Sequence, residues 1–184
     1  TQNGVIVTSG GQVLMQASAV NDAMATAIIT HVGKINTSAA QAGNVSLLTD
    51  GGNIRISGSI NANSTDSSKV GGDIYIGRDV TTNKLAKATD VSGATLLSNK
   101  GFVETSGEHL ATDGISIKAA EWLLDPSDIT ISNSANSNVT GVSPADITPN
   151  GGTGTSSIVQ VSTIQGAINA GTNVTIKTTN VSNA

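Results

Sequence analysis

Aromatic side chains are almost absent from this chain, and that absence narrows the folds it can adopt. Trp122, Tyr75 and Phe102 are the three aromatic residues among 184. Aromatic residues normally supply much of the apolar area that a core buries. Here Val, Ile, Leu and Ala must fill that role, which requires a narrow interior lined by small branched side chains. Thin β-architectures meet that requirement.

Short segments of alternating apolar residues recur along the chain and predict β-strands of four or five residues. Most of them are bounded by the turn-forming residues Gly, Asn and Asp. The segments are residues 12–16, 45–48, 53–57, 73–76, 114–118, 128–132, 157–161 and 173–177. Their spacing is uneven, as expected if each coil of a solenoid contributes two or three strands joined by loops of different length.

Stacked coils would give these strands the stability that a single coil lacks. One coil buries three or four branched side chains, each worth about 1.5–3 kcal/mol. Ordering its roughly 20 backbone residues costs about 1–2 kcal/mol each, so neighbouring coils must share a ladder and a core. The sequence therefore predicts an all-β fold, a parallel β-helix (β-solenoid) spanning residues 1–184, with about seven or eight coils spaced by about 4.8 Å. An antiparallel sandwich is the alternative, because it also uses short strands.

The alternation predicts which side chains point into the β-helix. The residues expected to point inward are Val13, Val45, Ile54, Ile56, Ile74, Ile76, Ile115, Ile117, Ile129, Ile131, Val174 and Ile176.

Two helical insertions and one loop are also expected. Ser162 to Gln165 matches a capping box, followed by apolar residues at helical spacing and a stop at Gly171. Residues 21–29 carry small, helix-compatible side chains, although Ile28 and Ile29 equally fit a strand. Residues 140–156, with two Pro residues and the run GGTGTSS, predict an exposed loop.

Charge and cysteine content exclude several functions. The net charge is −4 and no basic stripe is present, so nucleic acid is not expected as a partner. The absence of Cys excludes disulfides and thiolate metal sites. No cofactor and no metal site are expected.

Several segments resemble the filamentous-haemagglutinin-like exoproteins of two-partner secretion, the family that includes the high-molecular-weight adhesins. Residues 9–18 (SGGQVLMQAS) and 32–36 (VGKIN) are similar to its repeating strand units, and residues 71–79 (GGDIYIGRD) resemble its Gly-Gly strand starts. In residues 100–131, GFVETSG followed by WLLDPSDITI is the most specific likeness, and residues 161–177 look like the segment that follows it. The resemblance covers about two-thirds of the chain.

The resemblance implies a right-handed β-helix and a place in the body of a secreted fibre on the bacterial surface. The expected function is a structural and adhesive stalk segment that mediates attachment to cells or surfaces. The expected partners are an outer-membrane two-partner-secretion transporter, acting on a longer parent chain, and host-cell or surface receptors, glycans among them. The family body has no catalytic residues to carry over, so no enzymatic activity is expected.

A carbohydrate-active β-helix enzyme is the alternative from another functional class, because glycoside hydrolysis needs paired carboxylates. The residues that could supply acid–base groups are Asp73, Arg78, Asp79, Glu108, His109 and Asp113. Arg78 and Asp79 are interpreted as a solvated pair at a strand end, and Asp125, Pro126 and Asp128 as one turn. His31 and His109 are too far apart in sequence to suggest a metal site or a triad. Trp122 is expected to pack over a flank or under a loop rather than to bind a ligand.

Six N-x-S/T sequons give candidate glycosylation sites, and the resemblance raises that idea because some related adhesins are glycosylated. They begin at Asn36, Asn44, Asn63, Asn138, Asn173 and Asn180. About four are expected by chance in a chain so rich in Asn, Ser and Thr, so their number is not evidence of modification.

Both ends of the chain are strand-like and lack a polar cap. Val5, Ile6 and Val7 form one terminal strand, and residues 173–184 are read as a strand and a polar tail without a capping helix. An outermost strand presents unpaired N–H and C=O groups, which can pair with a strand of another segment. Each end is therefore expected to abut another β-helical segment, and a filament subunit assembled end to end is the alternative within the structural class.

Overall fold

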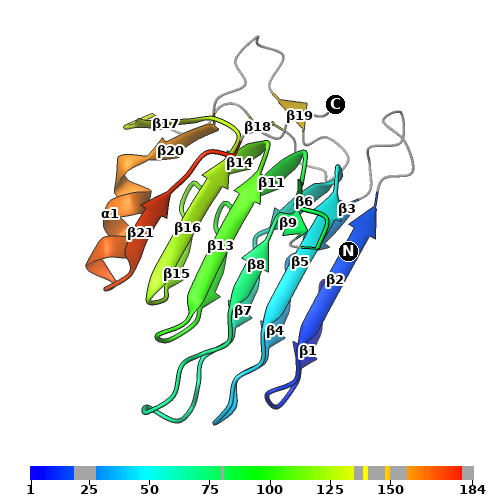
Figure 1. The fold of residues 1–184 in the computed structure, drawn as a ribbon, viewed down its shortest axis with the longest axis vertical. Helices are drawn as coiled ribbons and strands as arrows, with labels where there is room; N and C mark the ends of the chain where they lie inside the picture. Colours follow the sequence, from blue (N-terminus) through cyan, green and yellow to red (C-terminus); the bar gives the residue numbers. More distant parts are fainter. Residues whose placement is uncertain (19–27, 80, 135–138, 141–147, 150–156, 180–184) are drawn as a thin grey trace.

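The chain forms an all-β parallel β-helix, as the sequence predicts (Figure 1). The computed structural model describes residues 1–18, 28–79, 81–134, 139–140, 148–149 and 157–179. Three parallel sheets make up the faces of the β-helix, and the chain passes through sheet 1, sheet 2 and sheet 3 in each coil. The strands of all three sheets pair in parallel, so the sandwich alternative is wrong.

Each sheet gains one strand from each successive coil. Sheet 1 contains β1 (Val5–Val7), β4 (Lys34–Asn36), β7 (Ser59–Asn61), β12 (Thr95–Leu97) and β15 (Ser116–Lys118). Sheet 2 contains β2 (Val13–Ser18), β5 (Val45–Asp50), β8 (Ile74–Ile76), β13 (Phe102–Gly107), β16 (Glu121–Pro126) and β21 (Asn173–Ile176). Sheet 3 contains β3 (Ile28–His31), β6 (Asn53–Ile56), β11 (Ala88–Asp90) and β14 (His109–Ala111). The longest sheet has six strands, fewer than the seven or eight coils expected.

The remaining elements are insertions into this repeat. They are an antiparallel pair, β9 (Arg78–Asp79) with β10 (Lys84–Leu85); a parallel pair, β17 (Ile129–Ser132) with β20 (Ser157–Gln160); an antiparallel pair, β18 (Val139–Thr140) with β19 (Thr148–Pro149); and α1 (Val161–Asn169). Residues 140–156, expected as an exposed loop, lie mostly outside the described residues, and so do residues 21–27 of the weaker predicted helix. Ile28 and Ile29 belong to β3.

The core consists of columns of inward side chains that stack from coil to coil. Register in sheet 2 aligns one column of Val13, Val45, Ile74, Val103, Trp122 and Val174, and a second of Met15, Leu47, Ile76, Thr105, Leu124 and Ile176. Ile35, Ile60, Leu96 and Ile117 form the corresponding column in sheet 1. In the middle coils these side chains are buried, so each coil covers the core of the next.

Most of the residues predicted to point inward do so. Val13, Val45, Ile54, Ile56, Ile74, Ile76 and Ile117 are buried, and Ile115, Ile129 and Val174 are partly buried against the core. One prediction is wrong, because Ile131 is 50% exposed. Ile176 is 37% exposed, although it continues the inward column of Leu124. Ile176 lies in the terminal strand of sheet 2. Ile131 lies in β17, and β20 rather than β17 follows β14, where the Leu110 N–H donates to Ser157 Oγ at 2.8 Å.

The predicted helix is present, but its start is not the predicted capping box. Ser162 lies inside α1, and the N-cap is Gln160, which makes no side-chain capping bond. β20 leads directly into α1, which packs Thr163 and Ala167 next to β15. The helix ends as predicted near Gly171, which has a φ of 84°. None of the helices in the described part of the chain could span a lipid bilayer.

Trp122 lies in the core rather than on a flank. It is fully buried in a sheet 2 column, and its indole N–H donates to Thr105 Oγ1 at 3.0 Å. The expectation that it packs rather than binds is confirmed, but its predicted place over a flank or under a loop is wrong. An indole fits this column because its polar group finds a buried partner on the neighbouring coil.

Aspartate substitutions at Ile117 and Ile131 test the inward assignment. We expect Ile117→Asp to destabilise the fold by about 3–5 kcal/mol, because it buries an unpaired carboxylate. Ile131→Asp, at an exposed position, should change stability by no more than about 0.5 kcal/mol. Urea unfolding followed by circular dichroism measures both, and equal losses in the two variants would contradict the assignment.

Candidate binding surface

The outward side chains of sheet 1 form two mostly polar rows, which we call the sheet 1 surface. One row contains Val5, Lys34, Ser59, Thr95 and Ser116. The other contains Val7, Asn36, Asn61, Leu97 and Lys118. Neighbouring members of a row are spaced by about 4.8 Å, the distance between paired strands. The surface thus presents hydroxyl, amide and ammonium groups at regular intervals and contains no carboxylate.

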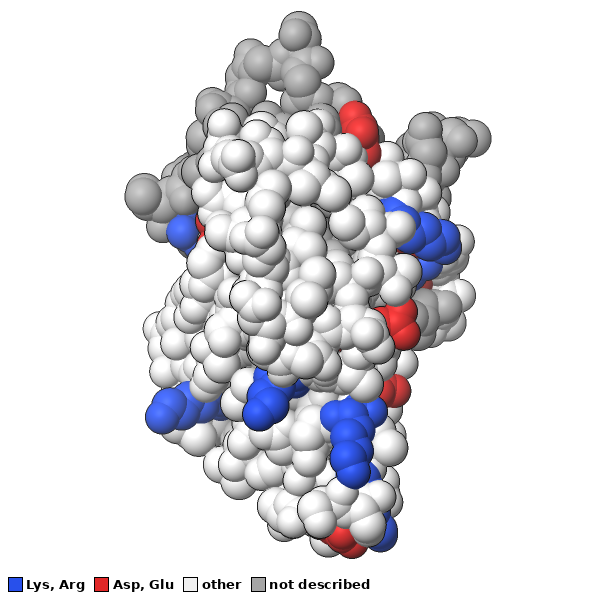
Figure 2. All heavy atoms as spheres, turned by 90° about the vertical axis from the view of Figure 1, so that its left-hand side faces the viewer, with Lys and Arg blue, Asp and Glu red and all other residues white. Residues whose placement is uncertain are grey.

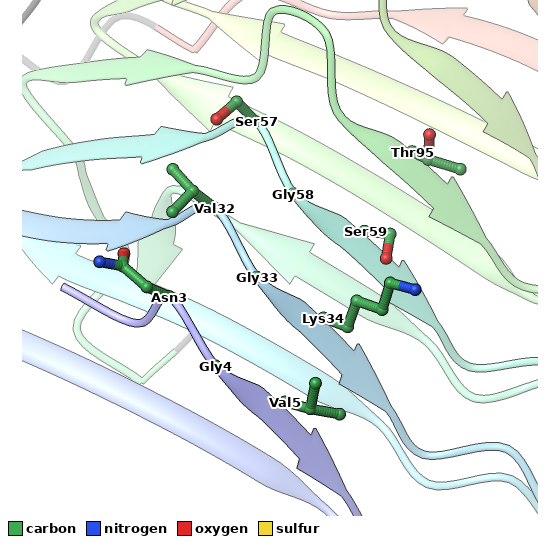
Figure 3. Close-up of a pocket in the computed structure, with 10 residues that line it drawn as sticks. All are labelled: Asn3, Gly4, Val5, Val32, Gly33, Lys34, Ser57, Gly58, Ser59 and Thr95. Atoms are coloured by element: carbon green, nitrogen blue, oxygen red, sulfur yellow. The ribbon is translucent and has the colours of Figure 1, made fainter.

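A groove of about 440 Å³ lies at the beginning of these strands (Figure 3). It is lined by Asn3, Gly4, Val5, Val32, Gly33, Lys34, Ser57, Gly58, Ser59 and Thr95. In Figure 3 the side chains of Lys34, Ser59 and Thr95 lie side by side on successive strands. The groove therefore continues the polar row of the sheet 1 surface.

Two glycines keep the floor of the groove at the level of the backbone. A Cβ added to Gly33 would lie 2.0 Å from the carbonyl oxygen of Gly4, and one added to Gly58 would lie 2.3 Å from that of Gly33. Such distances are impossible for a real side chain, so successive coils can approach this closely at the corner only where they carry glycine. The hollow is a consequence of how the coils stack.

The chemistry of the groove is suited to binding rather than to acid–base catalysis. Hydroxyl groups donate and accept hydrogen bonds, and the Lys34 ammonium donates to anionic or hydroxyl oxygens. Glycoside hydrolysis requires two carboxyl groups that flank the bond to be cleaved. None of the lining residues is Asp or Glu.

Two of the carboxylates considered for catalysis hold the backbone and neighbouring side chains in place instead. Asp73 accepts the Phe102 N–H at 3.1 Å and the Tyr75 hydroxyl at 3.2 Å. Asp79 is buried and accepts the Thr81 N–H at 2.8 Å, which is the main reason that its pKa lies below the ordinary value. Glu108 precedes His109 at the start of β14, and Asp113 follows that strand.

Arg78 does not form the expected solvated pair with Asp79. Its guanidinium forms ion pairs with Glu104, at 3.3 Å between Nε and Oε1, and with Asp125. Asp125 is fully buried, and Glu104 is buried as well. Thr179 Oγ1 also donates to Asp125 at 2.9 Å. We call Arg78, Glu104 and Asp125 the ion-pair cluster.

The sequence interpretation missed this cluster because it placed Asp125 in a turn. Asp125 and Pro126 belong to β16, and the Asp128 carboxylate accepts the N–H of Ile129 at 2.7 Å beyond that strand. Ser106 and Asp125 are register partners on β13 and β16, so Glu104 and Asp125 lie close together on the same face of these adjacent strands. The alternation of Trp122 and Leu124 with Leu123 and Asp125 is the signal that could have found it.

The two histidines lie at opposite edges of sheet 3, on β3 and β14, and do not share a site. His31 is buried, with Nδ1 2.5 Å from Gln2 Oε1 and Nε2 3.2 Å from the Ser59 carbonyl oxygen. Within the described residues, no group of three or more His, Cys, Asp or Glu side chains could hold a metal ion.

The sequon asparagines differ in their surroundings. The Asn44 side-chain oxygen accepts the Asp73 N–H at 2.9 Å, and that of Asn63 accepts the Asn99 N–H at 2.7 Å. Asn36 is half-buried and accepts from the N–H and hydroxyl of Ser38. Asn173 is exposed at the start of β21. Asn138 and Asn180 lie outside the described residues.

Comparisons with protein-family models, with curated proteins and with solved structures give no match.

Replacing Arg78 tests the ion-pair cluster. We expect Arg78→Met to destabilise the protein by about 3–5 kcal/mol, because it leaves the buried Asp125 carboxylate with only the exposed Lys177 ammonium, 4.0 Å away, as a counter-charge. Arg55→Met is the matched control, since Arg55 pairs with Asp90 at 3.6 Å in a more exposed position and should cost at most about 1 kcal/mol. Thermal and urea unfolding give both values, and similar losses would show that the cluster has no special role.

Burial of His31 makes stability depend on pH. Burial lowers the pKa of His31 below 6.5, although hydrogen bonds with Ser59 and Gln2 act in the opposite direction. The unfolded chain therefore protonates His31 more readily than the folded chain does. The contribution of neutral His31 to the free energy of unfolding is thus complete above about pH 6.5 and is lost as the pH falls below it. We expect the urea midpoint to fall between about pH 7.5 and 5.5, and His31→Gln to flatten that fall. An unchanged slope in the variant would refute this assignment.

Proposed function

We propose that this chain is a structural and adhesive stalk segment of a secreted bacterial surface fibre. The observation that carries the proposal is the sheet 1 surface, a rigid array of Ser, Thr, Asn and Lys side chains repeated from coil to coil. A flat array of this kind suits contact with an extended, polar ligand. Glycans on host cells or other surfaces are such ligands, because their hydroxyl groups match the donors and acceptors of the array.

The sequence resemblance to filamentous-haemagglutinin-like exoproteins supports the cellular part of this proposal. In that setting a longer parent chain is exported through an outer-membrane two-partner-secretion transporter and stays at the cell surface or outside the cell. The β-helix holds the sheet 1 surface away from the cell, since its length grows with the number of coils. The proposal includes no catalytic activity, because Asp73 and Asp79, two of the carboxylates considered for hydrolysis, hold backbone groups and neighbouring side chains.

Reversing the charge of Lys34 tests this proposal. We expect the purified chain to bind cultured epithelial cells or immobilised sialylated and neutral oligosaccharides, and Lys34→Glu to weaken that binding about tenfold, or about 1.4 kcal/mol. Lys87→Glu is the matched control, because Lys87 is also exposed but lies just before β11 of sheet 3. Flow cytometry and surface plasmon resonance measure both variants.

Two results would contradict the proposal. The first is binding that neither variant weakens, which would place the contact on another face. The second is the absence of binding to all of these surfaces, which would leave the chain without an adhesive role.

A further inference from the structure

The outward faces of sheet 1 and sheet 2 differ in charge. The sheet 1 surface carries the ammonium groups of Lys34 and Lys118 and no carboxylate. On the outward face of sheet 2, Phe102 lies between two carboxylates, because its N–H donates to Asp73 Oδ1 at 3.1 Å and its register partner is Glu121. In Figure 2, Lys or Arg residues lie at the lower left, whereas most of the visible Asp and Glu residues lie along the right-hand margin, which is the sheet 2 side. Surfaces of opposite charge attract each other.

The charges of Asp73 and Glu121 are available to a partner. Both carboxylates accept hydrogen bonds from hydroxyl groups, but neither forms an ion pair among the described residues. Most other charged groups on the sheet 2 side are already paired within the molecule. Lys177 lies beside the ion-pair cluster, and Lys84 Nζ donates to Asp50 at 3.0 Å.

The edges of the two faces correspond coil by coil. The last outward position of the sheet 1 strands holds Asn36, Asn61, Leu97 and Lys118, and the first outward position of sheet 2 in the same coils holds Asn44, Asp73, Phe102 and Glu121. The coil of β15 and β16 thus combines the Lys118 ammonium with the Glu121 carboxylate. The coil of β12 and β13 combines the apolar side chains of Leu97 and Phe102, and that of β7 and β8 combines an amide with a carboxylate.

The asparagines of the sheet 1 edge are oriented to donate hydrogen bonds outward. Asn36 Oδ1 accepts the Ser38 N–H at 3.1 Å, and Asn61 Oδ1 accepts the Asn63 N–H at 3.1 Å. Because these oxygens are used within their own loops, the side-chain NH2 groups remain as donors. In the coil of Asn61, the edge of sheet 2 offers the Asp73 carboxylate as an acceptor.

Two β-helices that lie side by side with parallel axes bring these edges together. Both copies wind in the same sense, so the strands of the two facing sheets run in opposite directions. The last positions of the sheet 1 strands then lie opposite the first positions of the sheet 2 strands. Coils are spaced by about 4.8 Å in both copies, so the correspondence is kept along the axis. The adjoining corner carries charges of both signs, Asp66 close to Lys69 and Lys100.

We propose that a second copy of this chain packs its sheet 1 surface against the outward face of sheet 2, with parallel axes and equivalent coils at the same level. Lys118 of one copy then lies opposite Glu121 of the other, and Leu97 lies opposite Phe102. Phe102 and Tyr75, whose ring centroids are 5.8 Å apart, form the aromatic part of this contact. Aromatic residues are enriched in protein–protein interfaces. The contact is heterologous, because it joins two different faces, so further copies can add side by side.

The contact involves the sides of the β-helix, so it applies equally to a segment within a longer chain. It goes beyond the proposed adhesive function, because it joins fibres laterally into a bundle. The outermost copy on one side of such a bundle keeps its sheet 1 surface free for ligands.

Charge reversal on each face tests the contact. At an ionic strength of about 0.01 M, the unmodified chain should associate as its concentration rises, and Lys118→Glu or Glu121→Lys should each weaken association about tenfold. An equimolar mixture of the two variants should associate as strongly as the unmodified chain, because opposite charges again face each other. Lys87→Glu is the matched control, because Lys87 is exposed on the sheet 3 side. Sedimentation velocity measures all of these samples.

The mixture distinguishes a lost contact from a lost fold, because recovery requires both variants to be folded. A chain that stays monomeric at low ionic strength would refute the proposal. A mixture that associates no better than its components, or an equal effect of Lys87→Glu, would refute it as well. The binding test of Lys34 uses none of the variants of the two faces, so the adhesive function can fail independently.

Cross-linking tests the level at which the coils meet, because the chain has no cysteine of its own. We expect a mixture of Leu97→Cys and Phe102→Cys proteins to give dimers with a short bismaleimide cross-linker, and either protein alone to give few. Efficient cross-linking of one variant to itself would overturn the heterologous arrangement. The absence of a mixed product would overturn the proposed alignment of coils.

Discussion

The parallel hydrogen-bond ladder between successive coils is the constraint on which the rest of this structure depends. Each coil is too small to bury its own apolar side chains, so it is stable only when another coil pairs with its strands. The ladder keeps equivalent residues in register over six strands of sheet 2. Inward side chains then stack in columns, and outward side chains stack in rows. The core and the surface rows both follow from that one repeat.

The same repeat explains where polar and charged groups are tolerated in the interior. Trp122 and Thr105 occupy core columns of neighbouring coils and satisfy each other by a hydrogen bond. The ion-pair cluster joins β9, β13 and β16, with Thr179 from the segment after β21. Its buried carboxylates are stable because Arg78 supplies a counter-charge between them. The cluster therefore joins four segments of the chain through side chains, in addition to the backbone ladder between neighbouring strands.

The outward face of sheet 1 carries the features on which the proposed function rests. It has regular polar rows and a groove whose floor is backbone at Gly33 and Gly58. Its hydroxyl, amide and ammonium groups form hydrogen bonds, so this face suits reversible contact with polar ligands.

Composition and alternation predicted an all-β fold of short strands, because Val, Ile, Leu and Ala replace aromatic residues in a narrow core. The parallel pairing that excludes an antiparallel sandwich was decided by the tertiary structure. Composition and alternation also located the principal strands and most inward residues, since alternation is a local property. The tertiary structure decided what depends on contacts between coils. It placed Ile131 outside, because β20 took the position beside β14, and it moved Asp125 from a predicted turn into a strand beside Arg78. Sequence spacing cannot predict such pairings, because variable insertions determine which strands become neighbours in space.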